Sequence, residues 1–140
     1  MSDKRAREDS FSSVIDAYLA AALGCALFGA VYECFSHGVF SPFMVCAFAF
    51  PLLLGALPLC LLRSFGRPFP RPPAADLVHA GVAALTVGSI LRGVLDIYGT
   101  TNSLLAAYWI AGAALSAAGW LSAFLSGSGG AFSSQRKKEL

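Results

Sequence analysis

A few ionisable side chains lie within otherwise apolar stretches of this sequence, and they are the residues best able to do chemistry. Arg92 and Asp96 are four positions apart, a spacing that puts both on one face of a helix and permits an ion pair. Glu33 lies near the end of an earlier apolar stretch. Ionisable groups inside a membrane are costly, so they mark candidate functional positions. The candidate polar cluster consists of Glu33, His37, Arg92 and Asp96, with Tyr32 and Tyr98 as supporting residues.

Three interpretations of the polar cluster stay open. In the first, Arg92 pairs with carboxylates and fixes the register of neighbouring helices. In the second, the cluster is the floor of an outward-facing pocket or a proton-linked relay, because His37 can change charge near neutral pH. In the third, Arg92 extends to the lipid headgroups. Residues 32–42 combine acidic, imidazole, hydroxyl and aromatic groups, so we expect a functional surface there.

The composition indicates whether most of the chain is surrounded by water or by lipid. The 140 residues suit one domain, and 56% of them are hydrophobic while only 13% are charged. Soluble domains are about 45–50% apolar and about 25% charged. The mean hydropathy is +0.66. These values argue against a soluble enzyme, a disordered chain and a nucleic-acid binder, and they predict an integral, multi-pass membrane protein whose main partner is the lipid bilayer.

Four stretches are long and apolar enough to cross a membrane, since a spanning helix needs about 20 residues. The predicted fold is all-α, a polytopic membrane protein forming a compact bundle of four transmembrane helices in two hairpins. The spans are predicted over 14–35, 43–62, 74–98 and 104–125, within a transmembrane domain of 14–125. Residues 1–13 form the N-terminal tail and residues 126–140 a basic C-terminal tail in this interpretation.

The distribution of Lys and Arg predicts the orientation. Nine of the ten basic residues lie in the two tails or in the connection between the second and third spans. The positive-inside rule makes that side cytoplasmic, with both termini inside and the polar cluster toward the outer leaflet. The first span resembles a secretory signal, but its apolar run is longer, so we expect it to be retained. The short length of the chain and its high content of Ala and Gly favour a bacterial plasma membrane as its location.

Small residues predict where helices pack closely. In lipid, helix association depends on close packing and polar contacts rather than on further hydrophobic burial. Ala80, Ala84 and Gly88 recur at every fourth residue and are predicted to form a helix-packing seam. The pairs Ala20/Gly24 and Ala113/Ala117 have the same spacing.

Two prolines predict a distorted second span. Pro51 and Pro58 lie seven residues apart on roughly one helix face. Proline has no backbone N–H and clashes with the preceding turn, so a kink that frees carbonyl groups is expected. Such breaks line substrate sites in some transporters, yet they also occur in helices without that role.

The sequence shows no motif of a known catalytic or metal centre. The four cysteines, Cys25, Cys34, Cys46 and Cys60, include no C-x-x-C pair, so no metal and no cofactor are expected. No catalytic residue is predicted, and we expect the protein not to be an enzyme. The favoured function is an accessory or scaffolding component of a membrane complex, as a homo-oligomer or with another membrane protein. The alternative is a small oligomeric transporter or channel with a polar site in the outer leaflet.

Overall fold

The described part of the chain is helical apart from short connections. The computed structural model describes the backbone of residues 2–136 and the side chains of residues 2–126. No strand occurs in that part of the chain, which confirms the predicted all-α class. The elements are α1 (Ser2–Phe35), α2 (Pro42–Val45), the 3₁₀ helix η1 (Cys46–Phe48), the π-helix η2 (Pro51–Ala56), α3 (Leu57–Ser64), α4 (Pro72–Tyr98) and α5 (Leu105–Arg136).

Four helical segments are long and apolar enough to cross a membrane. They are Ser2–Phe35, Pro42–Ser64, Pro72–Tyr98 and Leu105–Ser126. Each contains nearly all of one span predicted from the sequence, and the number of such segments was correctly predicted. The second segment consists of α2, η1, η2 and α3 in succession.

The outermost helices extend beyond the predicted spans. Helix α1 begins at Ser2, so most of the predicted N-terminal tail continues the helix. Its charged turns carry the oppositely charged pairs Lys4/Glu8 and Arg5/Asp9 at a spacing of four, which favours a helix in water. The backbone of α5 stays helical to Arg136, while the side chains of the predicted basic tail after residue 126 lie outside the described part of the chain.

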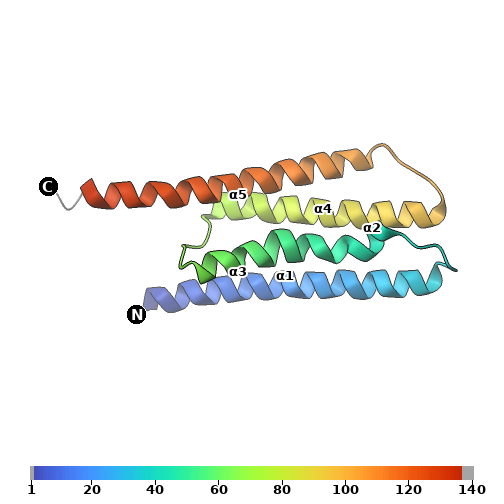
Figure 1. Ribbon diagram of the computed structural model, residues 1–140, viewed down its shortest axis with the longest axis horizontal. Coiled ribbons are helices and arrows are strands. Elements are labelled where there is room, and N and C mark those ends of the chain that lie inside the picture. Colours follow the sequence, from blue (N-terminus) through green and yellow to red (C-terminus); the bar gives the residue numbers. More distant parts are fainter. Residues whose placement is uncertain (1, 137–140) are drawn as a thin grey trace.

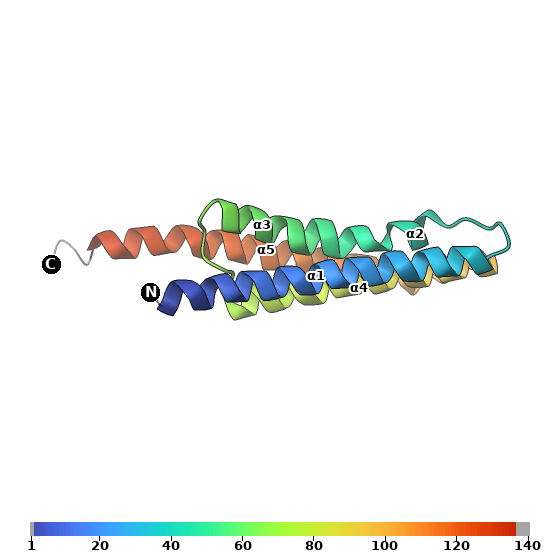
Figure 2. The ribbon, with the colours of Figure 1, turned by 90° about the horizontal axis from the view of Figure 1, so that it is seen from below.

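The long segments run side by side and form two staggered levels. Figure 1 shows them in the order α1, α3, α4 and α5 across the molecule. Seen at right angles, α1 and α4 occupy one level, whereas α3 and α5 occupy the other (Figure 2). The second segment packs against both α1 and α4, and the α4–α5 contact is the most extensive. The beginning of α1 and the end of α5 lie at the same end of the molecule (Figure 1).

The apolar core is concentrated in the half of the molecule near the start of α1. It contains Phe11, Ile15, Tyr18, Ala56, Leu59, Leu62, Val78 and Val82. Within it the Tyr18 hydroxyl and His79 Nδ1 share a hydrogen bond that ties α1 to α4. Toward the other end, Met44 is only 1% exposed, because Gly29 and Gly93 let two helices approach it. A Cβ at Gly93 would lie 2.9 Å from Met44 Cα.

Glycines also set the close approach of α4 and α5. A Cβ at Gly88 would lie 2.8 Å from Tyr108 Cβ, and one at Gly112 would lie 2.6 Å from Leu85 Cγ. Gly88 of the predicted helix-packing seam is therefore buried against α5. The two other seam residues differ: Ala84 is half-buried and Ala80 is exposed.

The second segment is distorted around its prolines. A 3₁₀ turn at Cys46–Phe48 is followed by a π-helical stretch at Pro51–Ala56. Pro58 has no N–H to donate to the carbonyl of Leu54, four residues earlier. The Trp120 indole N–H from α5 donates to this carbonyl instead, at 3.0 Å. A side chain of a neighbouring helix thus satisfies a backbone group that the proline leaves without its usual partner.

Candidate functional site

Ser41 joins two carboxylates at the end of the molecule opposite the termini. Its backbone N–H donates to Glu33 Oε1 of α1 at 3.1 Å. Its hydroxyl donates to Asp96 Oδ2 of α4 at 3.3 Å. Ser41 is completely buried, while both bonds are part-buried because their carboxylate ends are partly exposed. The first connection of the chain is therefore fastened to α1 and to α4 through a single residue.

The local sequence explains why Ser41 reaches this position. The Ser36 hydroxyl donates to the Glu33 carbonyl at 2.8 Å where α1 ends. His37 and Gly38 have positive φ values of 56° and 92°, which turn the chain back. Pro42 occupies the first turn of α2, with Ser41 as its N-cap residue. The Ser41 hydroxyl makes no capping bond to α2, because it donates to Asp96.

Arg92 and Asp96 form the ion pair that their spacing permits. Arg92 Nε lies 3.0 Å from Asp96 Oδ1, although the Nε–H is not aligned as a hydrogen bond. The two side chains are 35% and 25% exposed, so the contact is partly screened. The Arg92 guanidinium carbon also lies 5.5 Å from the centroid of the Phe43 ring, in cation–π range.

A hydrogen bond holds Phe43, the residue whose ring the Arg92 guanidinium contacts. The Ser89 hydroxyl of α4 donates to the Phe43 carbonyl at 2.7 Å. Ser89 is 1% exposed, and the bond is part-buried. Phe43 is thereby fixed to the same helix that carries Arg92.

The charges of this group do not cancel. It contains two carboxylates and one guanidinium, and within the described residues Arg92–Asp96 is the ion pair present. Glu33 is half-buried and accepts a backbone N–H instead of facing a cation. If both acids are ionised, the arrangement carries one net negative charge. Among the described residues, Glu33 is thus the acid of this site that faces no cation.

The structure brings together three of the four residues of the predicted polar cluster. Glu33, Arg92 and Asp96 are linked through Ser41. His37 is exposed on the connection and lines a shallow pocket beside them with Tyr32 and Tyr98. The Tyr32 and Tyr98 side chains lie close enough to interact electrostatically.

Sequence reasoning included Ser41 only as part of the predicted functional surface of residues 32–42 and did not single it out, and it missed Phe43. The available signal was the Ser-Pro pair before an apolar run, which is typical of a helix start. That signal does not reveal which distant carboxylate the hydroxyl will contact.

No metal site is formed by the part of the chain that the structure describes. No three His, Cys, Asp or Glu side chains there are close enough together to hold an ion. The four cysteines are free thiols, and Cys34, Cys46 and Cys60 are exposed.

Comparison of the chain with protein-family models, curated proteins and solved structures finds no match in any of the three. Fold and site define the class: an all-helical protein with four helices long and apolar enough to cross a membrane. A buried serine connects acidic side chains of its first and third long segments.

Proposed function

We propose that this protein is a scaffolding or accessory subunit of a membrane complex, folded as a four-helix bundle with both termini in the cytoplasm. Its lipid-facing surfaces are the means of association, with a second copy or with another membrane protein. A bacterial plasma membrane is the proposed location.

The observation that carries this proposal is an exposed row of alanines on α5. Ala107, Ala111, Ala114 and Ala118 follow one another at helical spacings of four, three and four, and all four are exposed. Small side chains let a neighbouring helix approach the backbone closely, which is the main source of affinity between helices in lipid. We call this row the alanine face.

Uneven burial of the long helices also supports the proposal. Only 17% of the most apolar stretches of α1 and α5 is buried, compared with 44% for α4. The two outer helices therefore keep most of their surface for lipid or for partners. On α1, a Cβ added at Gly24 would meet no atom within 4 Å, so this small-residue site is also open.

Replacing two alanines of the alanine face by leucine tests this function. The double variant Ala114→Leu/Ala118→Leu places larger apolar side chains on an exposed face of α5. Ala83→Leu makes the same change on the exposed side of α4 and is the matched control. Energy transfer between labelled copies in lipid vesicles measures self-association, and copurification from gently solubilised native membranes detects another partner.

The wild type and Ala83→Leu are expected to associate, while the double variant stays helical and loses association. Unchanged association of the double variant contradicts the proposal. So does a wild-type chain that remains a monomer in vesicles and retains no protein partner from native membranes.

A small transporter or channel is the second candidate, and the unpaired acid Glu33 is the observation that favours it. Glu33→Gln keeps an oxygen acceptor for the Ser41 N–H but cannot take up a proton. If the chain conducts, this variant abolishes a pH-dependent flux in proteoliposomes and leaves the protein folded. If scaffolding is the function, wild type and variant both show no such flux.

A further inference from the structure

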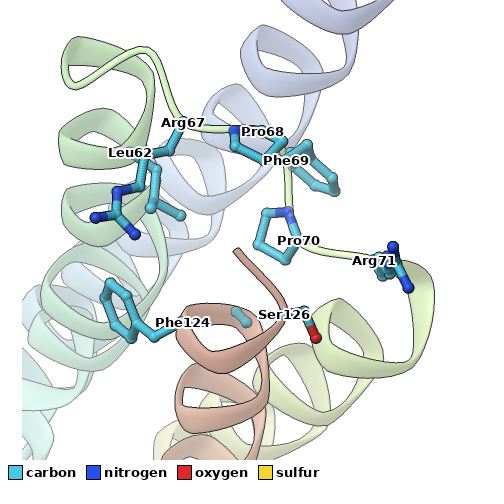
Figure 3. A pocket seen from close by; sticks show the side chains of 9 residues that line it. Leu62, Arg67, Pro68, Phe69, Pro70, Arg71, Phe124 and Ser126 are labelled. Atoms are coloured by element: carbon cyan, nitrogen blue, oxygen red, sulfur yellow. The ribbon is translucent and has the colours of Figure 1, made fainter. Parts of the chain in front are cut away.

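Two adjoining pockets lie at the connection between α3 and α4, at the end of the molecule that holds the termini. One is lined by the connection itself, by Leu62 of α3 and by α5, and Arg67 and Arg71 are among its lining residues (Figure 3). The other continues along α3 and is lined by Pro58, Leu61, Leu62, Phe65, Arg67 and Phe124. The pockets share Leu62, Arg67 and Phe124, so a polar compartment leads directly into an apolar groove.

The end of α3 dictates the position of Arg67. Gly66 has a positive φ of 63°, and its N–H donates to the Arg63 carbonyl at 3.1 Å. The Arg67 N–H donates to the Leu62 carbonyl at 2.9 Å. This pair of bonds is a Schellman motif, which reverses the chain at a helix C-terminus. As a result the Arg67 side chain lies over Leu62 and near Phe124 (Figure 3).

Aromatic packing holds the rest of the connection in place. The Phe69 ring meets the Phe11 ring edge to face, with centroids 5.1 Å apart. Phe11 is 3% exposed, and Pro70 is buried. Pro72 then occupies the first turn of α4. The polar compartment is therefore built on a fixed segment of chain.

The two pockets differ in chemistry. Arg67 and Arg71 line the compartment from opposite sides of Pro70 (Figure 3), and no carboxylate among the described side chains lines either pocket. Neither Arg67 nor Arg71 forms an ion pair with any described residue. The groove has apolar walls, and Phe65 and Phe124 are 77% and 50% exposed. This combination fits a ligand with an anionic head and a hydrocarbon tail.

The pockets also lie at the depth that such a ligand needs. The second long segment has 23 residues, about enough to cross a hydrocarbon core of about 30 Å. Its end at Ser64 therefore falls near the headgroups, with the groove extending back toward the acyl chains. Basic pockets between helices at the cytoplasmic surface bind anionic lipid headgroups, and that is the side on which the positive-inside rule puts this connection.

We propose that this site binds one anionic phospholipid, with its phosphate at the Arg67 guanidinium and an acyl chain along Leu61, Phe65 and Phe124. Each basic residue near an anionic membrane surface contributes about 1 kcal/mol, which corresponds to about a fivefold change in affinity. Arg63 is on the same segment and is exposed, but it lines neither pocket. It is the matched control.

The test uses the full chain in detergent micelles, titrated with phosphatidylglycerol or phosphatidylcholine and followed by native mass spectrometry. One phosphatidylglycerol is expected to bind more tightly than phosphatidylcholine. Arg67→Gln is expected to weaken phosphatidylglycerol binding about fivefold, and Arg63→Gln by much less. Phe124→Ala is expected to weaken it as well, and Arg67→Lys to restore much of the affinity. Circular dichroism verifies that each variant remains helical.

Equal affinity for the two lipids overturns the proposal, and so does an equal loss in Arg67→Gln and Arg63→Gln. Soluble glycerol 3-phosphate is added as a competitor, because it has the phosphate but no acyl chains. It is expected not to displace the lipid. Full displacement would show a site for a free phosphate and contradict the assignment of the groove to an acyl chain.

Discussion

The Ser41 hydroxyl donates a hydrogen bond to Asp96 Oδ2 across 3.3 Å, although the two residues are 55 positions apart in the chain. This bond attaches the connection between the first two long segments to α4. The backbone N–H of the same serine binds Glu33, so one residue holds three elements together.

Ser41→Ala removes the bond to Asp96 and keeps the backbone bond to Glu33. We expect the free energy of unfolding to fall by about 1 kcal/mol, the usual net value of a hydrogen bond in a folded protein. Thermal unfolding in detergent micelles, followed by circular dichroism, measures the loss. As the control, Ser103→Ala changes an exposed serine in the connection between α4 and α5, and it should leave Tm unchanged. Equal Tm values for Ser41→Ala and wild type would contradict the structural role of this hydroxyl.

The Arg92–Asp96 pair is expected to show only weak coupling. Both side chains are partly exposed, and pairs of this kind contribute about 0.5 kcal/mol at a spacing of four. A double-mutant cycle with Arg92→Leu, Asp96→Leu and the double variant measures this coupling. We expect Asp96→Leu to cost more than Arg92→Leu, because Asp96 also accepts the Ser41 bond. A coupling of several kcal/mol would show that the pair is more enclosed than this geometry indicates.

Gly93→Ala and Gly24→Ala test the close approach of the helices. A Cβ at Gly93 would lie 2.9 Å from both the N and the Cα of Met44, and a backbone cannot move aside easily. We expect a loss of about 1–3 kcal/mol from this overpacking. At Gly24 a Cβ meets nothing within 4 Å, so Gly24→Ala should leave the stability of the monomer unchanged or raise it slightly. Similar Tm values for the two variants would refute this packing.

Trp120→Phe removes the donor to the Leu54 carbonyl and keeps an aromatic ring. We expect the free energy of unfolding to decrease by about 1 kcal/mol. Trp109 is the control, since it contacts Phe43 and Phe50 through its ring and makes no hydrogen bond among the described residues. Trp109→Phe should therefore cost less than Trp120→Phe. The reverse order would show that the Trp120 bond does not compensate for the proline.

Hydropathy predicted the elements well because the four spans are continuous apolar runs between Gly-, Pro- and Ser-containing breaks. It did not predict that α1 starts at Ser2, since charged residues with helix-stabilising pairs give no apolar signal. Hydropathy also did not indicate that Gly81 is buried whereas its neighbour Ala80 is exposed. Helix α4 has small residues on more than one face, and in lipid there is no contrast of polar and apolar sides to show which face is packed.

Residue type and spacing predicted only part of the site. The Arg92–Asp96 pair follows from local helix geometry alone. The position of Ser41 between Glu33 and Asp96 depends on how a turn with positive φ at His37 returns the chain to α4. His37 has the chemistry for a titrating site, but that same turn leaves it exposed on the connection.

The most direct test of the whole account is the topology of the chain in its membrane. A reporter that is active on only one side of the membrane is fused in turn to each terminus, and its activity is measured in intact cells. Four crossings with both ends inside predict that both fusions report the cytoplasm. Termini on opposite sides would contradict the account, and so would a chain that is recovered in solution after cells are broken without detergent.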